Sequence, residues 1–329
     1  MPSVETLGIF RQSLRDVVSR IYEKQIIMYR YTAYGLKINS DIPCPQLTAL
    51  NNHNNYTPDV HIHVGKVPKS LKNPVAKGVL YEAQPNEFLL RLDEIGAFWV
   101  RNGKELIIAP APSATDDEVR LFLFGSAFGA LLHQRGFLVL HASAIETHKK
   151  KAALFVGPSG NGKSTIAAAF HKNGHRVLAD DICALTLDEK KRPIVAPSFP
   201  QIKIWADTAK KMQHETQKLR KVRPQLEKYA LPIHKNFCSS PLLVSSIYHL
   251  RTHNKDEITI TPIEDSQKFR VLLSNTYRAR FIDGLAMRGT HFKQASVTAS
   301  TARILAVTRP SGTFLLEELT TFIEEDLTQ

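Results

Sequence analysis

One segment constrains the fold more than any other part of the chain. Residues 152–156 form an apolar run, residues 157–164 satisfy the pattern G-x-x-x-x-G-K-[ST], and an alanine-rich run follows at 166–172. Asn173-Gly174 then supplies a usual helix C-terminal signal. A strand, a glycine-rich loop and a helix in this order predict an α/β domain that binds a nucleoside triphosphate. The alternative is an ordinary tight turn, and the flanking strand and helix argue against it.

The chemistry of such a loop follows from its backbone. The loop amides turn inward to hold phosphate oxygens, and the start of the helix adds its positive end. Lys163 is expected to reach the terminal phosphates, and the Ser164 hydroxyl to bind magnesium. ATP and Mg²⁺ are therefore the expected cofactors. The predicted nucleotide-binding residues are Gly157, Pro158, Ser159, Gly160, Asn161, Gly162, Lys163, Ser164 and Thr165.

Two carboxylates follow closely. Residues 176–181 predict a short strand that ends in Asp180 and Asp181, on the strand that comes directly after the loop helix. One carboxylate can hold magnesium while the other accepts a proton from an incoming hydroxyl. These are the minimum requirements for transferring a phosphoryl group to an alcohol. A structural role remains open, because an aspartate at a strand end often caps the next turn.

The order of four motifs resembles the family of HPr kinase/phosphorylase. The motifs are Leu140-His141-Ala142-Ser143, the loop at 157–164, Gly174-His175-Arg176 and Ala179-Asp180-Asp181. The resemblance implies an α/β fold with a P-loop kinase core and a mixed central sheet, as in HPr kinase and phosphoenolpyruvate carboxykinase. It also implies a smaller β-rich domain before that core.

The same resemblance implies roles for individual residues. Asp180 matches the family's general base, Asp181 and Ser164 match its metal ligands, and His141 matches a histidine that tunes the proton of the base. For His141 the residues themselves leave another interpretation open. A histidine on an apolar strand is often a hydrogen-bonded core residue.

Other segments resemble a subgroup of these proteins. The signature Glu-Ile-Arg-Gly-Leu-Gly, which belongs to the phosphorolytic reaction, does not occur. Residues 34–43, 196–207 and 275–278 instead resemble HPr-kinase-like proteins encoded with peptide-modification systems, including kinases of lasso-type ribosomal peptides. The resemblance implies transfer of the γ-phosphoryl group of MgATP to a serine hydroxyl of a peptide, either acidic or leader-bearing. Related kinases form rings, so a homo-oligomer is also an expectation.

Three alternatives to a peptide kinase stay open at this stage. The acceptor could be an HPr-like protein or a small metabolite, as in a carboxykinase-like enzyme that shares the loop and the acidic strand. The chain could also be a non-catalytic protein that binds a peptide under the control of the nucleotide. Movement of the γ-phosphate to a peptide, rather than only to water, distinguishes a kinase from such a binding protein.

Three further side chains are candidates for contacts with phosphate or substrate. Arg278 and Arg280 alternate along one segment, and either could stabilise charge on the transferring phosphoryl group. Pairing with surface carboxylates is the alternative for both. Asp207 follows an apolar strand and could add a second magnesium contact, whereas a helix N-cap is its structural alternative.

Composition fits a globular enzyme and restricts its partners. Among 329 residues, 43% are hydrophobic and 22% are charged, with three scattered cysteines that argue for a reducing compartment. No run is apolar enough to span a bilayer and no leader precedes the chain, so we expect a cytoplasmic protein without a membrane partner. The net charge of +12 could attract nucleotide and acidic peptide, or reflect solvated lysines on turns. No nucleic-acid-binding signature accompanies it, and no nucleic-acid partner is expected.

The pattern along the chain predicts two domains. Residues 1–112 are expected to form an N-terminal helix and a β-rich domain, and residues 113–329 the P-loop kinase domain. The predicted helices span 5–22, 116–134, 208–228 with a break near Pro224, 267–274 and 315–327. The predicted strands span 26–29, 59–64, 87–92, 97–100, 105–108, 182–187, 194–196, 242–250, 258–263 and 304–307.

Overall fold

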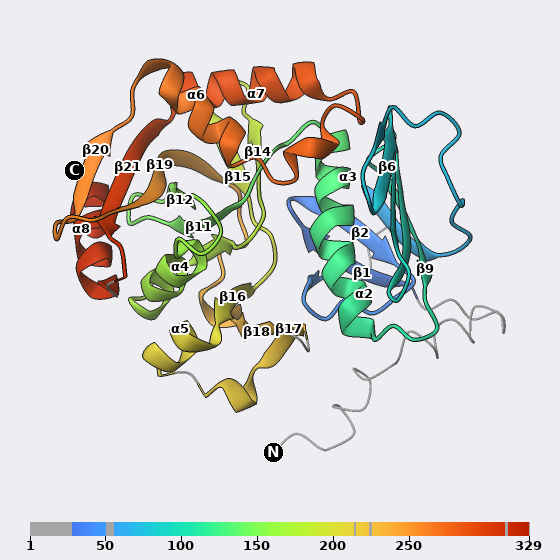
Figure 1. Cartoon of the computed structure of the whole chain (residues 1–329), viewed down its shortest axis with the longest axis horizontal. Helices are drawn as coiled ribbons and strands as arrows, with labels where there is room; N and C mark the ends of the chain where they lie inside the picture. The colour runs from blue at the N-terminus through green and yellow to red at the C-terminus, as the bar shows by residue number, and fades with distance from the viewer. Residues whose placement is uncertain (1–27, 51–55, 214, 224–225, 313–314, 329) are drawn as a thin grey trace. The chain divides into compact units, whose positions relative to one another are not determined.

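The computed structural model describes residues 28–50, 56–213, 215–223, 226–312 and 315–328 (Figure 1). The helix predicted at 5–22 lies outside these residues. Contacts divide the chain into two compact units, the first comprising Met1–Arg135 with Arg280–Met287 and the second Gly136–Ala279 with Arg288–Gln329. The division therefore falls after Arg135, whereas the sequence places it after residue 112.

The first unit contains a sheet in the order β3-β1-β2-β4-β9-β8-β7-β6-β5. Antiparallel hairpins form its β6–β9 part, and the turn between β8 and β9 holds Asn102 and Gly103 at φ values of 53° and 60°. Asparagine and glycine suit a hairpin turn of this kind because they tolerate positive φ. The strands are β1 Tyr29–Ala33, β2 Leu36–Ser40, β3 Thr48–Ala49, β4 Val60–Val64, β5 Ala76–Lys77, β6 Tyr81–Gln84, β7 Glu87–Leu92, β8 Gly96–Arg101 and β9 Glu105–Pro110.

The helix predicted at 116–134 is present and belongs to this first unit. It consists of α2 Asp116–Phe122, the π-helical turn η2 Leu123–Ala127 and α3 Phe128–Gln134. Thr115 and Glu118 form a capping box at its start. The Phe128 ring stacks on Tyr34 at a centroid distance of 5.5 Å, and the Gln134 side chain accepts a hydrogen bond from the Gly103 amide at 2.7 Å. These contacts bind the helix to the N-terminal sheet.

The second unit is an α/β structure around a mixed sheet, so the predicted fold class is confirmed. Its strands follow the order β10-β14-β15-β19-β12-β11-β13, with β21 beside β19 and β20 beside β21. The strands β12, β19 and β21 are parallel, and the other described pairs are antiparallel. The strands are β10 Leu138–Leu140, β11 Ala142–Glu146, β12 Ala152–Val156, β13 Val177–Ala179, β14 Cys183–Leu187, β15 Pro193–Ala196, β19 Leu242–His253, β20 Thr259–Pro262 and β21 Arg303–Pro310.

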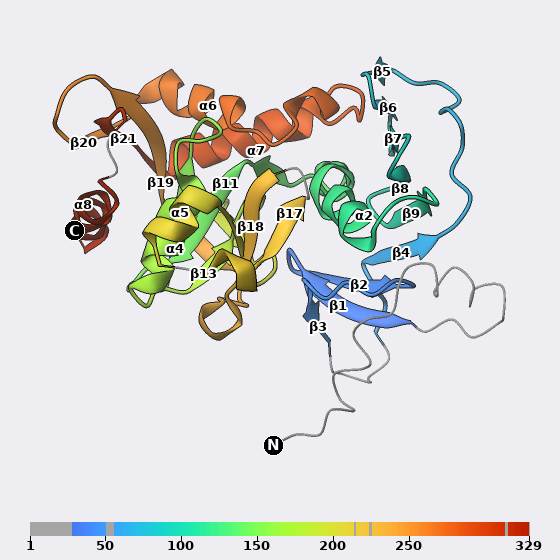
Figure 2. The same ribbon diagram turned by 60° about the horizontal axis from the view of Figure 1, so that its bottom comes forward.

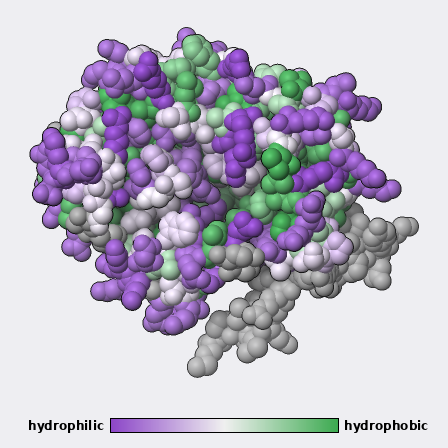
Figure 3. Space-filling view, in the orientation of Figure 1, coloured by the Kyte–Doolittle hydropathy of each residue, from purple (hydrophilic) through white to green (hydrophobic). Residues whose placement is uncertain are grey.

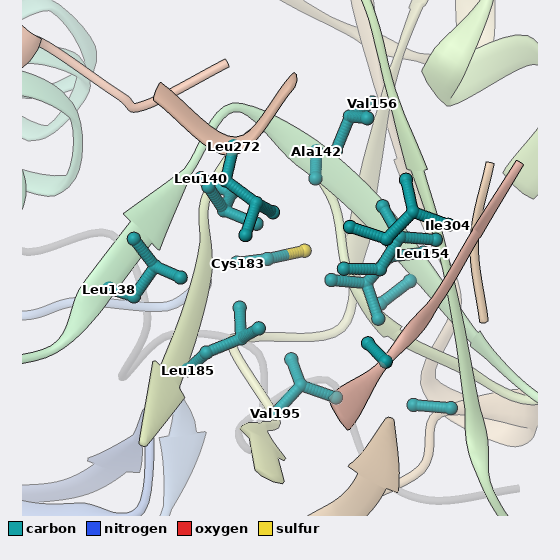
Figure 4. Close-up of a cluster of buried hydrophobic side chains, with 14 of the residues drawn as sticks. Leu138, Leu140, Ala142, Leu154, Val156, Cys183, Leu185, Val195, Leu272 and Ile304 are labelled. Carbon is teal, nitrogen blue, oxygen red and sulfur yellow. The ribbon is translucent and has the colours of Figure 1, made fainter. Parts of the chain in front are cut away.

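Helices cover both faces of this sheet (Figures 1 and 2). Leu154 and Val156 of β12 point to the face that packs on α6 and α7, where Leu272 joins the buried cluster shown in Figure 4. Ala153 and Phe155 point to the face that packs on α4, α5 and α8. Because β12 is buried on both sides, its sequence is continuously apolar rather than alternating. The helices are α4 Lys163–Lys172, α5 Ala206–Lys211, α6 Asp265–Ser274, α7 Arg288–Thr301 and α8 Leu316–Thr328.

The prediction of a long helix at 208–228 is wrong. The helix α5 ends at Lys211, and the chain then forms β17 Arg220–Arg223 and β18 Leu226–Pro232. The strand β18 pairs with β16 Gln201–Trp205 and with β17 to make a separate small sheet. Many lysines, glutamines and glutamates favour a helix here, but strand pairing, which buries Tyr229 and Leu231, overrides that local propensity.

The surface and the thiols agree with the expected globular character. Hydrophilic side chains cover much of the face shown in Figure 3, with hydrophobic ones scattered among them. Within the described part of the chain, no helix is both long and apolar enough to cross a membrane. Cys44, Cys183 and Cys238 are all buried free thiols.

The central position of β12 gives a test of the core. Replacing Phe155, which is fully buried, by alanine (Phe155→Ala) should lower the free energy of unfolding by about 3–5 kcal/mol, because it removes buried apolar area and leaves a cavity. Urea unfolding followed by circular dichroism measures the change. Leu273→Ala is the control, since Leu273 is 38% exposed and should cost far less. Equal losses in both variants would contradict this description of the core.

Candidate functional site

The order of three strands brings the predicted site residues to one edge of the sheet. The strand β11 lies between β12 and β13 and is antiparallel to both. The glycine-rich loop follows the last residue of β12, Asp180 follows the last residue of β13, and His141 precedes the first residue of β11. Since β11 runs in the opposite direction, its beginning and the ends of its two neighbours lie at the same edge.

The glycine-rich loop has the backbone that its sequence predicts. Gly157, Gly160 and Gly162 have φ values of 148°, 88° and 91°, which disfavour other residues. A Cβ atom at Gly157 would lie 2.9 Å from the Leu250 carbonyl oxygen of the neighbouring strand β19. The Asn161 side chain donates to the same oxygen at 3.1 Å and fixes the loop to that strand. The helix α4 then begins at Lys163.

Lys163 is buried and folded back onto its own loop. Its Nζ donates to the carbonyl oxygens of Gly157 at 2.8 Å and Pro158 at 3.0 Å. Burial lowers the pKa of the Lys163 ammonium, while the charges of Asp180 and Asp181 act in the opposite direction. The loop lysine and the acidic pair are therefore electrostatic neighbours.

Asp180 is held in a buried polar network. Its side chain Oδ1 accepts a hydrogen bond from the Ser143 hydroxyl at 2.6 Å, and Oδ2 accepts one from the Lys203 backbone amide at 2.7 Å. The residue is 4% exposed. The carboxylate is thus fixed in orientation by two donors, one from β11 and one from β16.

Asp181 is more exposed and is paired with two basic side chains. Its Oδ2 lies 2.7 Å from Lys203 Nζ and its Oδ1 lies 3.3 Å from His141 Nδ1. His141 Nδ1 also lies 2.9 Å from the Asp181 carbonyl oxygen, so this nitrogen carries a proton and donates. Burial opposes ionisation, but Lys203 and His141 outweigh it and hold the pKa of the Asp181 carboxyl well below its usual value. The backbone has a φ of 72°, which turns the chain sharply after Asp180.

The residues present fit a magnesium ion. Ser164 follows Lys163 in the first turn of α4 and is partly exposed, and Asp181 is held in its ionised form. A hydroxyl and a carboxylate are the oxygen ligands that Mg²⁺ takes, with water and phosphate oxygens completing its shell. Ser164 and Asp181 are the side chains that would hold it, and Asp181 would then share its charge between the ion and Lys203.

A cavity lies directly beside the loop. Its volume is about 250 Å³, and it joins the loop to α5, the end of β21 and α8. Asp207 lines this cavity from the first turn of α5, where Trp205 and not Asp207 is the N-cap. The lining residues are Gly160, Asn161, Gly162, Thr165, Ile166, Asp207, Thr208, Lys211, Arg309, Gly312, Leu315, Leu316 and Leu319. The mixture of small, basic and apolar groups suits the nucleoside part of a ligand whose phosphates occupy the loop.

The two candidate arginines lie in different units. Arg278 belongs to the second unit, is exposed, and its guanidinium lies 5.6 Å from the centroid of the Tyr277 ring. Arg280 belongs to the first unit, where its guanidinium lies over the rings of Tyr81 and Phe281. A phosphate contact therefore stays a prediction for both arginines.

Three residues of the site had no role in the sequence analysis. Ser143 and Lys203 bind Asp180, and Lys203 also binds Asp181. Tyr277 lies beside His141 at a ring-centroid distance of 6.1 Å, and both burial and the charge of Asp181 raise its pKa. Lys203 alternates with the buried Ile202 and Ile204 of β16. This alternation places it on the opposite face of the strand, but not beside a particular carboxylate.

Comparisons with known proteins add one similarity. No family model matches the chain, and no curated protein matches it. Among solved structures, the chain is similar to the Hpr(Ser) kinase/phosphatase from Coxiella burnetii, with 12% sequence identity over 57% of this chain and 89% of that one and a TM-score of 0.30. At these values the similarity assigns no activity to the chain, and the peptide-modification subgroup stays a prediction.

The pair of Asp181 and Lys203 predicts a dependence of stability on pH. Because the pKa of Asp181 is lower in the folded than in the unfolded chain, its contribution is complete above the unfolded value of about 4 and is lost as the pH falls toward the folded value. The free energy of unfolding should therefore fall more steeply below pH 5 in the wild type than in Asp181→Asn. Urea unfolding at a series of pH values measures both curves, and parallel curves would contradict the pairing.

Proposed function

We propose that this chain is an ATP-dependent kinase that transfers the γ-phosphoryl group of MgATP to a serine hydroxyl of a peptide. One observation supports it most: the loop lysine and the pair of Asp180 and Asp181 lie at the same sheet edge and influence each other's charge. A phosphate cradle beside a fixed carboxylate is the arrangement that phosphoryl transfer to an alcohol requires.

The different surroundings of Asp180 and Asp181 suit the two carboxylates to different roles. The lowered pKa of Asp181 makes it a weak proton acceptor and a good ligand for a cation. Asp180 accepts its two hydrogen bonds from a hydroxyl and a backbone amide, whereas Asp181 accepts one from the Lys203 ammonium, so Asp180 is the better candidate for the base. The magnesium ion held by Ser164 and Asp181 would neutralise charge on the phosphates.

The proposed step forms one P–O bond and breaks another. The serine oxygen attacks the γ-phosphorus and forms the new P–O bond, while its proton passes to the Asp180 carboxylate. The bond between the γ-phosphorus and the bridging oxygen breaks, and ADP leaves with that electron pair. Lys163 gives up its bonds to the carbonyls of Gly157 and Pro158 and contacts the phosphates. Orientation of the reactants and charge neutralisation would supply most of the rate.

Sequence and charge both support a peptide as the acceptor. The segments 34–43, 196–207 and 275–278 resemble the peptide-modifying subgroup, and the second of them contains Lys203. Lys211 and Arg309 line the cavity beside the loop, and Lys228 lies close enough for its charge to lower the pKa of Lys163. Cationic side chains of this kind favour an acidic acceptor. An HPr-like protein or a small hydroxyl-bearing metabolite remains the alternative acceptor.

A second candidate function is supported by the burial of Asp180. Both of its oxygens already accept hydrogen bonds, and the residue is 4% exposed. A carboxylate that serves only to fix β11, β13 and β16 would have these same contacts. The chain would then be a nucleotide-gated peptide-binding protein without transferase activity.

Two substitutions test the kinase. Lys163→Ala should remove ATP binding and transfer together, because the phosphates lose their cation. Asp180→Asn should keep ATP bound while transfer falls by roughly 10²–10⁴-fold, the usual contribution of a general base. Label from γ-³²P-ATP is followed into serine-containing acidic peptides and small hydroxyl acceptors, and binding is measured by calorimetry.

The matched control is Asp188→Asn. Asp188 is an aspartate of the β14–β15 hairpin that pairs with Arg192, and the substitution should leave transfer unchanged. Normal transfer by Asp180→Asn would remove it as the base. ATP binding without label in any acceptor would support the nucleotide-gated binding protein, and label only in small acceptors would overturn the peptide substrate.

A further inference from the structure

Two histidines and a glutamate meet on the second unit, outside the loop site. His148 lies in the turn between β11 and β12, His175 lies between α4 and β13, and Glu324 lies on α8. His148 Nε2 is 3.1 Å from Glu324 Oε1, and His175 Nε2 is 2.9 Å from Glu324 Oε2. The two imidazole rings are 4.7 Å apart between centroids. Nothing in the proposed kinase chemistry uses these residues.

The hydrogen bond made by His175 Nδ1 determines whether the other ring nitrogen, Nε2, can act as a ligand. His175 Nδ1 lies 3.0 Å from the Glu146 carbonyl oxygen, which can only accept, so Nδ1 carries a proton. In the neutral ring Nε2 then presents a lone pair to a carboxylate oxygen 2.9 Å away. Two lone pairs at this distance repel, and the contact therefore needs a cation. That cation is either a proton on Nε2 or a metal ion between the two atoms.

The surroundings of the Glu324 carboxylate favour a metal ion over a proton on His175 Nε2. Its Oε1 is buried and accepts no hydrogen bond among the described residues, although His148 Nε2 lies 3.1 Å from it. A buried carboxylate oxygen without a donor is costly. A metal ion satisfies such an oxygen and both imidazole nitrogens at once, without a directed N–H.

We propose that His148, His175 and Glu324 bind a divalent transition metal ion, with Zn²⁺ as the best match. Two imidazoles and one carboxylate are a usual three-ligand set for zinc, and the fourth position is left for water. Zinc–ligand distances of about 2.0–2.2 Å in a tetrahedron put the ligand atoms about 3.3 Å apart. His148 Nε2 and His175 Nε2 lie 3.1 Å and 2.9 Å from the two oxygens of the Glu324 carboxylate, each close to this value, and one ligand atom from each residue lies within 4.8 Å of the other two.

The surroundings support a bound ion in two ways. The Glu146 carbonyl that orients His175 is the outer partner that metal-bound histidines usually have. The neighbouring cations are also occupied elsewhere. Arg176 and Lys150 pair with the Glu146 side chain, and Lys149 Nζ donates to the Thr328 carbonyl oxygen. Their charges are therefore partly compensated beside the proposed site.

The ion would connect three separate parts of the second unit. It would join the β11–β12 turn, the segment after α4 and the C-terminal helix α8. The other end of α8 contributes Leu316 and Leu319 to the cavity beside the glycine-rich loop. A filled site would thus fix the helix that forms one wall of this cavity. His175 precedes β13 and Asp180 follows it, so the proposed site and the acidic pair lie at opposite ends of that strand.

The experiment uses the full chain without a histidine tag, freed of metal by a chelator. Titration with Co²⁺ should show one equivalent bound, with the intense visible absorption of a four-coordinate site, and Zn²⁺ should displace it. Zn²⁺ should also raise the melting temperature of the wild type, because a ligand that binds only the folded state stabilises it. Binding should weaken in acid, because protons compete with the metal ion for its ligands.

The variants are His148→Ala and Glu324→Gln. Both should weaken metal binding at least tenfold, whereas His234→Ala, at an exposed histidine of another segment, should bind like the wild type. His148 is 73% exposed at its side chain, so its removal should not prevent folding, and circular dichroism checks this. The proposal is overturned if the wild type binds no Co²⁺ or Zn²⁺, which would leave an imidazolium–carboxylate pair. It is equally overturned if His148→Ala binds as tightly as the wild type.

Discussion

The candidate site depends on the pairing of β11 with both β12 and β13. The strand β11 is a short buried segment, and its antiparallel position makes its beginning coincide with the ends of two strands that are parallel to each other. That coincidence brings a histidine, a phosphate loop and an acidic pair together although they are separated in sequence. Any register shift in these two ladders would move all three at once. Main-chain hydrogen bonds between these strands therefore set the relative positions of the candidate site residues.

Lys203 connects this edge to a different sheet. Its backbone amide holds Asp180 and its ammonium holds Asp181, so one residue of β16 sets the position of both carboxylates. Burial lowers the pKa of the Lys203 ammonium, but the charge of Asp181 outweighs this and leaves it raised. The cation and the anion thus stabilise each other's charged form in a site that is partly closed to water. Because Lys203 belongs to β16, the small sheet of β16, β17 and β18 contributes directly to the candidate site.

The sequence predicted the segments whose conformation depends mainly on residues close by in the chain. The loop from Gly157, the strand before it and the helix after it depend on glycine geometry and continuous apolar runs, and they occur as expected. The long helix predicted at 208–228 does not form, because the strands in this segment are stabilised by a partner strand that composition cannot reveal. Ser143 and Lys203 went unassigned for the same reason. Their importance lies in what they contact across the fold, and the spacing of residues along one chain does not encode such contacts.

The contacts of Lys163 also tie the first turn of α4 to the segment before it. Its ammonium donates to the carbonyl oxygens of Gly157 and Pro158, so residues 157, 158 and 163 are joined in one short ring of contacts. These two acceptors satisfy a buried cation that would otherwise be costly. Replacing Lys163 would therefore leave two loop carbonyls without this donor, and it would loosen the glycine-rich turn as well as remove a positive charge.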